Sequence, residues 1–200
     1  MTASARIFDH PFGGVSWLMD EPMHRTSHAL AIDGRVWLVD PVDHPEAMER
    51  VAALGPPAGV LQLIDRHNRD CAAIARRLGI EHHTVPGAVP DTPLETIAVL
   101  RLPRWRETAL WWPQREVLVV AETIGTAEAF TAGHGAVGIH PLLRLLPPRA
   151  LGATRPDHLL SGHGPPVSGP DARDGVDWAY AHARRDVPRL LLALPRLARG

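Results

Sequence analysis

Residues 63–79 read LIDRHNRDCAAIARRLG and carry the pattern that decides the fold. The apolar run at 60–64 is typical of a short buried strand. Residues 72–78 have helical spacing, and Gly79 favours a left-handed stop. A polar turn therefore joins a strand to a helix, and it contains Asp65, His67, Asp70 and Cys71.

This turn has two interpretations. Asp70 precedes the predicted helix, where a carboxylate commonly caps free backbone amides, and the other residues would then be solvated loop. Alternatively, the carboxylates, imidazole and thiol are ligands of a metal ion. The choice depends on what the rest of the chain brings to the same place.

Alternating strands and helices surround the turn. The dipeptide Asp33-Gly34 between two apolar runs predicts a hairpin, and a second hairpin is predicted where PQR separates two further apolar runs. This order favours one domain over residues 1–200 with two packed sheets flanked by helices. The predicted strands are 28–32, 35–40, 60–64, 82–85, 97–102, 108–112, 116–121 and 158–160, and the main helices are 45–54, 72–78, 171–185 and 188–199.

Composition limits the classes of function. The chain has 200 residues, is 45% hydrophobic and carries a formal net charge of -1, which predicts a soluble globular domain with no general attraction to nucleic acid or to a membrane surface. A single cysteine excludes an internal disulfide, and no secretion signal is recognised at the start, so we expect a cytoplasmic protein. The apolar run at 190–194 is too short to span a bilayer. A small molecule is the expected partner, and the apolar stripe of the last helix could pack on a second copy.

Polar residues follow several of the predicted strands. Asp40 and Glu122 each end an apolar run, and His163 lies in the segment SGHGPP after another. Sheet strands can bring such ends together on one edge, where oxygen and nitrogen ligands could hold a divalent metal with water as the nucleophile.

These motifs, taken in order, resemble the metallo-β-lactamase fold superfamily. The resemblance covers about residues 27–167 and implies a four-layer αββα sandwich of two mixed sheets, in an α/β class of hydrolases with paired metals between the sheets. The Gly-His-Gly segment is its most specific part and implies that His163 binds the second metal. The motifs are VWLVDP at 36–41, the turn after LQLI, ALWWPQREVLVVAE at 109–122, HPLLR at 140–144 and LLSGHGPPV at 159–167.

The chain departs from the family turn His-x-His-x-Asp-His. Alignment from the strand side puts Asp65 and His67 at the first two histidines and leaves Arg69 and Asp70 at the Asp-His pair. Alignment from the helix side puts Asp70 and Cys71 at that pair instead. The Gly-His-Thr turn expected next is replaced by PRWRET at 103–108, and Glu122 replaces the bridging aspartate.

The resemblance leaves two forms of the site open. The first metal would keep Asp65 and His67 but lack a third ligand, so we expect it to be absent. The second could hold one zinc or iron ion through Asp70, Cys71, Glu122 and His163. Alternatively, arginines neutralise the carboxylates without a metal, and this metal-free form is favoured. The candidate arginines are Arg66, Arg69, Arg104 and Arg106.

Two functions follow from these forms. The first is a hydrolase of a small ester, thioester, lactone or phosphoester, with Asp65 or Asp70 as proton acceptor. The second is an inactive pseudoenzyme that binds a small molecule or a protein partner. Nucleic-acid processing is disfavoured by the balanced charge.

Overall fold

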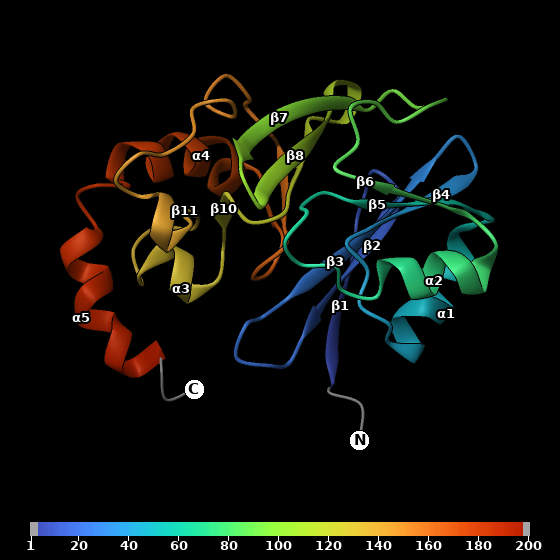
Figure 1. The fold of residues 1–200 in the computed structure, drawn as a ribbon, viewed down its shortest axis with the longest axis horizontal. Helices are drawn as coiled ribbons and strands as arrows, with labels where there is room; N and C mark the ends of the chain where they lie inside the picture. Colours follow the sequence, from blue (N-terminus) through green and yellow to red (C-terminus); the bar gives the residue numbers. More distant parts are fainter. Residues whose placement is uncertain (1–3, 198–200) are drawn as a thin grey trace.

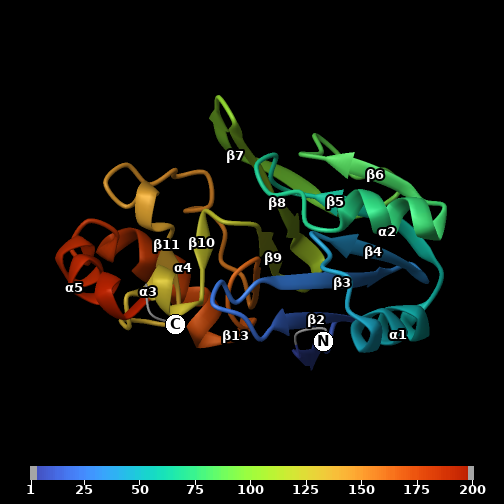
Figure 2. The same cartoon turned by 60° about the horizontal axis from the view of Figure 1, so that its bottom comes forward.

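The structure is a computed structural model that describes residues 4–197, with side chains described as far as Leu192. Two sheets pack face to face and helices cover their outer faces (Figures 1 and 2). No helix in the described range is both long and apolar enough to cross a bilayer. Residues 198 and 199, which the sequence places in the last helix, lie outside the described residues.

The N-terminal sheet has six strands in the order β1-β2-β3-β4-β5-β6. Its first four strands are antiparallel, and β4, β5 and β6 are parallel. At the hairpin between β3 and β4, Asp33 and Gly34 both have positive φ, at 49° and 77°, as a tight two-residue turn requires. The strands are β1 Ala5–Asp9, β2 Gly14–Met19, β3 Thr26–Ile32, β4 Arg35–Val39, β5 Pro57–Gln62 and β6 Glu81–Thr84.

The C-terminal sheet has five strands in the order β13-β12-β9-β8-β7. Its strands β9 and β12 are parallel, and the other pairs are antiparallel. A separate two-stranded sheet is made by β10 Ile124–Gly125 and β11 Gly138–Ile139. The five strands are β7 Glu95–Leu102, β8 Trp105–Trp112, β9 Val117–Val120, β12 His158–Ser161 and β13 Val167–Ser168.

The helices complete the four layers. Helices α1 and α2 pack on the outer face of the N-terminal sheet, and α4 packs on the outer face of the C-terminal sheet. The predicted αββα sandwich is therefore confirmed. The helices are α1 Pro45–Leu54, α2 Cys71–Leu78, α3 Glu128–Thr131, α4 Pro170–His182 and α5 Val187–Leu197, with 3₁₀ turns at Pro113–Arg115 and Pro141–Leu143.

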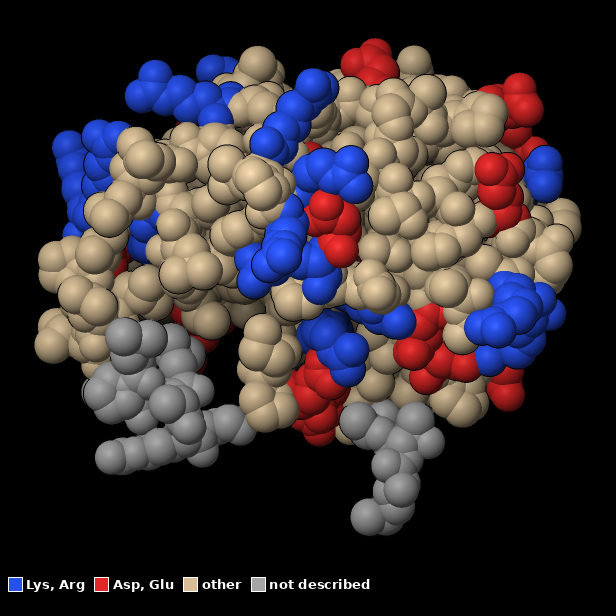
Figure 3. All heavy atoms as spheres, viewed as in Figure 1, with Lys and Arg blue, Asp and Glu red and all other residues tan. Residues whose placement is uncertain are grey.

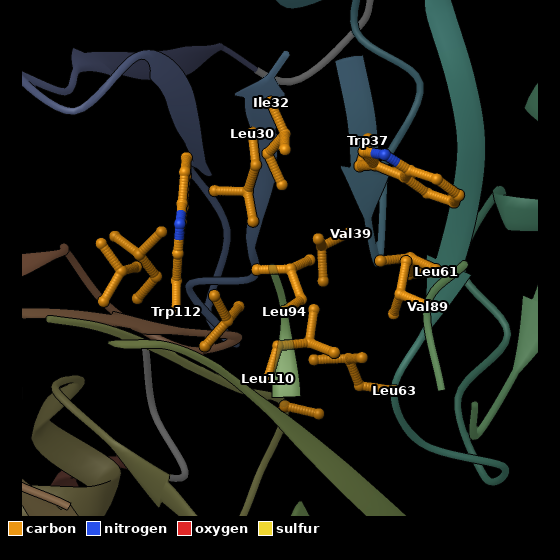
Figure 4. Packing of buried hydrophobic residues seen from close by; sticks show 14 of the residues in the cluster. Leu30, Ile32, Trp37, Val39, Leu61, Leu63, Val89, Leu94, Leu110 and Trp112 are labelled. Carbon is orange, nitrogen blue, oxygen red and sulfur yellow. The ribbon is translucent and has the colours of Figure 1, made fainter. Parts of the chain in front are cut away.

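The main core lies between the two sheets. Leu30, Val39 and Leu61 from one sheet meet Leu110 and Trp112 from the other (Figure 4). Alternate residues of each strand face this layer, because side chains alternate between the two faces of a sheet. The layer fixes the position of one sheet edge against the other, and the candidate site is built at that edge.

Two isolated bridges join the sheets at this edge. Arg25, just before β3, pairs with His163 after β12, and Ile64 after β5 pairs with Glu107 in β8. The residues that follow β4, β5, β9 and β12 are thereby held together, and we call this edge the rim.

Candidate functional site

A small pocket of about 140 Å³ opens at the rim. Its polar wall consists of side chains from the turn after β5, the end of β9 and the loop after β12, while Met23, Ile64 and Ala121 give it apolar surface. We call it the rim pocket, and its lining residues are Met23, Arg25, Ile64, His67, Arg69, Ala121, Glu122 and His163.

A carboxylate with two imidazoles forms the centre of this pocket. Glu122 Oε1 lies 2.9 Å from His67 Nε2 and 3.6 Å from His163 Nε2. Burial alone would raise the pKa of Glu122, but the neighbouring imidazoles of His163 and His67 hold that pKa below its ordinary value. Glu122 is therefore a carboxylate near neutral pH, placed between two histidines.

The two histidines have different surroundings. His163 is buried and its Nδ1 lies 2.8 Å from the Met23 carbonyl, so Nδ1 must carry the proton because a carbonyl only accepts. Its contact with Glu122 is then attractive when Nε2 is protonated as well. The His67 side chain is about half exposed; with Nε2 directed at Glu122, its Nδ1 is left for solvent or a ligand.

The loop that carries His163 is fixed by close backbone contacts. A Cβ at Gly162 would lie 2.3 Å from the Ala121 carbonyl oxygen, and one at Gly164 would lie 2.2 Å from the Ala127 nitrogen. Gly164 also has φ of +93°, a conformation that favours glycine. The absence of a side chain at Gly162 and Gly164 therefore lets β12 end against β9 with His163 at the pocket.

Glu122 is positioned from behind by a second carboxylate. Glu107 is fully buried; its Oε1 accepts hydrogen bonds from the backbone amides of Glu122 and Thr123, and its Oε2 accepts one from the Thr123 hydroxyl. Burial raises the pKa of Glu107 to about 7, against those hydrogen bonds, which lower it. Glu107 is not among the site residues predicted from the sequence; it lies in the polar segment RET of β8, just before the apolar run ALWW.

His140 is a further residue close to this group. Its Nδ1 accepts a hydrogen bond from the Leu142 amide, and its ring meets the edges of Trp105 and Phe130 at centroid distances of 5.0 and 5.5 Å. Burial lowers the pKa of His140 to about 4, although the charge of Glu122 raises it. His140 is therefore a neutral ring near the carboxylate of Glu122.

Arg69 is the residue that most changes the interpretation of the rim. Its Nη1 donates to the carbonyl oxygens of Thr26 and Asp40, at 2.6 and 2.9 Å, and its Nη2 donates to that of Gly162 at 2.8 Å. These three carbonyls belong to segments from both sheets, so a single guanidinium links the two sheets. Burial lowers the pKa of Arg69, while the charges of Asp40 and Glu122 raise it, and an arginine stays protonated.

Asp40 braces the same edge. Its Oδ1 accepts a hydrogen bond from the Leu63 amide, and its backbone has φ of 43°. Burial raises the pKa of Asp40 to about 6, and Arg69 opposes that shift. Asp40 therefore orients the start of the turn and adds negative charge beside the guanidinium.

Two of the predicted ligands are turned away from the pocket, and this corrects the sequence interpretation. Asp70 Oδ2 accepts a hydrogen bond from the Asp43 amide at 2.8 Å, so this carboxylate fixes the start of α2 against the loop after β4. Cys71 is fully buried in the apolar layer under α1 and α2, and burial raises the pKa of its thiol. Neither residue joins Glu122, and Asp70 is not placed to accept a proton there.

Asp65 also lies outside the cluster. Its two carboxylate oxygens accept hydrogen bonds from the Arg106 backbone amide and from Arg106 Nε, each at 2.8 Å. The side-chain hydrogen bond from Arg106 is the main reason that the pKa of Asp65 is below its ordinary value. The predicted neutralisation by arginine is found here, but the predicted role of Asp65 as a proton acceptor has no support in this geometry.

The other arginines have separate places. Arg66 lies over the ring of Trp105 at 4.3 Å, and Arg104 is exposed in the turn between β7 and β8. Of the predicted site residues, His67, Arg69, Glu122 and His163 thus come together. The strand-side alignment places Arg69 at the position of the family aspartate. The structure agrees with this alignment, because the Arg69 side chain lines the rim pocket.

The rim donors are not assembled into a metal-binding group in the described part of the chain. His67, Glu122 and His163 are chemically acceptable to zinc, and Glu122 Oε2 is buried without a hydrogen-bond partner in the described part of the chain. However, no three or more His, Cys, Asp or Glu side chains within residues 4–197 are grouped so that they could hold a metal. The guanidinium of Arg69 also gives the rim a fixed positive charge that opposes a second cation.

Comparison with solved structures supports the fold. The metallo-β-lactamase FIM-1 from Pseudomonas aeruginosa, in its mono-zinc form, aligns with a TM-score of 0.61 at 11% identity, over 94% of this chain and 98% of that one. A metallo-β-lactamase from Hirschia baltica gives 0.61 at 11% over 90% and 97%. One from Pontibacter korlensis gives 0.56 at 10% over 94% and 99%. No family model and no curated protein matches the sequence.

These likenesses, together with the two mixed sheets and their flanking helices, show that the chain has the metallo-β-lactamase fold. Since the same fold can carry unrelated chemistry, what the rim does is argued from its own residues.

Proposed function

We propose that this chain is a metal-independent member of the fold whose rim pocket binds a small uncharged molecule without turnover. The observation that carries the proposal is the Arg69 guanidinium on three backbone carbonyls. This guanidinium places a positive charge at the rim that comes from the chain itself instead of from a bound cation. Three of its N–H donors are already used by backbone carbonyls.

The pocket chemistry suggests what kind of molecule binds. The carbonyls of Thr26, Asp40 and Gly162 occupy three of the five Arg69 donors. Arg25 forms a bidentate ion pair with Glu21. Both arginines are therefore already engaged within the chain, which favours an uncharged ligand over an anion. His67 and Glu122 offer a hydrogen-bond donor and a hydrogen-bond acceptor to a ligand. Met23 and Ile64 offer apolar surface. A small ester or lactone matches this mixture, since it has acceptor oxygens and a short apolar part.

A second function is favoured by one observation. His67 directs Nε2 at Glu122 and leaves Nδ1 outward, which is the arrangement of a carboxylate that orients an imidazole base. In this form His67 would take a proton from a water molecule as the water oxygen bonds to the carbonyl carbon of the ester. It would then return the proton to the alkoxide oxygen as the acyl C–O bond breaks, without a metal. The predicted proton acceptors Asp65 and Asp70 are then replaced by His67.

One titration separates these functions. The uncharged probe γ-butyrolactone is added to isotopically labelled protein, with and without a chelator, while amide shifts and ring opening are followed by NMR. We expect saturable shifts at Ile64, Ala121 and His163, with the lactone ring intact. Glu122→Gln should weaken the binding, and the exposed Glu116→Gln should not.

The other outcomes are equally informative. Chelator-resistant ring opening that is lost in His67→Ala and Glu122→Gln would establish the hydrolase function instead. Ring opening only after zinc is added, or an absence of saturable shifts at the rim, would overturn the proposal.

A further inference from the structure

A second and larger hollow lies away from the rim, between α4 and the segment that follows the 3₁₀ turn at Pro141–Leu143. It has a volume of about 950 Å³. One wall comes from residues 146–152 and the other from α4 and the turn after it. We call it the α4 groove, and its lining residues are Leu146, Pro147, Arg149, Gly152, Asp177, Tyr180, Ala181, Arg184 and Arg185.

Positive charge predominates in the α4 groove. Three arginines and one aspartate line it, and within the described side chains neither Arg149 nor Arg185 takes part in an ion pair. Arg184 uses Nε to hold the Leu145 carbonyl at 2.9 Å, which leaves its two terminal nitrogens. Figure 3 shows basic side chains grouped at the upper left, where α4 lies in Figure 1, with few acidic ones among them.

The Tyr180 hydroxyl, in a wall of the same groove, has no acceptor for its proton among the described residues. Tyr180 OH is inaccessible to solvent and forms no hydrogen bond of normal geometry with the described residues. Burial raises the pKa of Tyr180 to about 12, against a smaller opposing effect of the Leu151 backbone. The hydroxyl therefore keeps its proton at neutral pH, and an unpaired buried donor of this kind is costly unless a ligand accepts from it.

We propose that the α4 groove is a binding site for an organic phosphate. Guanidinium groups match the oxygens of a phosphate with paired donors, and the Tyr180 hydroxyl adds an uncharged donor after a small movement of the groove wall. Leu146, Pro147 and Ala181 offer apolar surface to the organic part. The site shares no residue with the rim pocket, so it does not depend on the function proposed there.

The test uses two probes, adenosine monophosphate and inorganic pyrophosphate, with adenosine as the uncharged control. Binding is measured by calorimetry at fixed ionic strength and located by NMR. We expect saturable binding of both probes, shifts at Gly152, Tyr180 and Ala181, and no binding of adenosine. The double variant Arg149→Ala/Arg185→Ala should weaken binding about tenfold or more, because it removes two charge-assisted contacts.

The matched control is Arg35→Ala/Arg76→Ala, which removes the same charge from exposed positions elsewhere. An equal loss of affinity in both double variants would mean that the probes are held by general charge attraction, and it would overturn the proposed site. A lack of saturable binding of either probe would also overturn it. Binding that Glu122→Gln removes would place the phosphate at the rim instead.

The variant Tyr180→Phe distinguishes a ligand-binding hydroxyl from a structural one. Loss of a ligand-binding hydroxyl lowers the affinity for the probes, whereas loss of a structural one lowers the stability of the free protein. Since the hydroxyl proton has no acceptor among the described residues, the free protein should lose little stability with phenylalanine, whereas the affinity for the two probes should fall several-fold. A clear loss of stability in the free variant would show that the hydroxyl has an internal partner and would contradict the proposal.

Discussion

Arg69→Leu is expected to lower the free energy of unfolding by about 3–5 kcal/mol, because it removes a charged donor shared by three backbone carbonyls where the two sheets meet and leaves the buried Asp40 carboxylate without a nearby positive charge. The carbonyls of Thr26, Asp40 and Gly162 lose their guanidinium contacts together. Asp40 also loses the positive charge that opposes its desolvation. Denaturant unfolding measures the change.

Arg66→Leu is the matched control for Arg69→Leu. It lies three residues earlier in the same turn, is exposed, and contacts the ring of Trp105. An exposed cation–π contact contributes about 0.5–1 kcal/mol. Equal effects of the two substitutions would mean that Arg69 does not link the sheets.

The second large effect concerns pH and Glu107. Its pKa is raised from 4.5 to about 7 in the folded chain, so the folded state binds a proton that the unfolded state has already released between these values. Its contribution to stability is therefore fully present below about pH 4.5 and is lost as the pH rises through 7. Between pH 5.5 and 8.5 this loss amounts to about 2 kcal/mol.

Glu107→Gln should remove that part of the pH dependence. The amide oxygen can still accept from the two backbone amides, and the amide nitrogen can donate to Thr123. We expect the unfolding free energy of the variant to fall less than that of the wild type between pH 5.5 and 8.5, by about 2 kcal/mol. The exposed Glu49→Gln should keep the wild-type slope, and parallel curves for wild type and Glu107→Gln would show that Glu107 does not carry the dependence.

Much of the fold can be read from local sequence. Asp33-Gly34 fixes one hairpin, and the run that ends at Gly79 fixes the start and stop of α2. The edge strand β1 and its neighbour β2 are not predicted from the sequence. β1 is only partly buried and shows no clean alternation, and it becomes a strand by pairing with β2 rather than through its own pattern.

The site was less predictable because side-chain direction depends on tertiary contacts. His67, Glu122 and His163 could be chosen from strand ends and the Gly-His-Gly segment. Asp70 and Cys71 are chemically suitable as metal ligands. However, Asp70 accepts a hydrogen bond from a backbone amide in the loop after β4, and Cys71 is buried in the apolar layer under α2. Arg69 enters the rim because its own backbone takes a left-handed conformation, with φ of 45°, which no propensity rule assigns to arginine.

Metal analysis of the purified chain tests the central claim most directly, namely that the Arg69 guanidinium takes the place of a bound cation at the rim. The protein is loaded with excess zinc, passed through a desalting column, and assayed for zinc and iron beside Glu122→Gln and Glu116→Gln. We predict that all three retain far less than one metal per chain. One tightly held zinc in the wild type and in Glu116→Gln, lost in Glu122→Gln, would contradict the account.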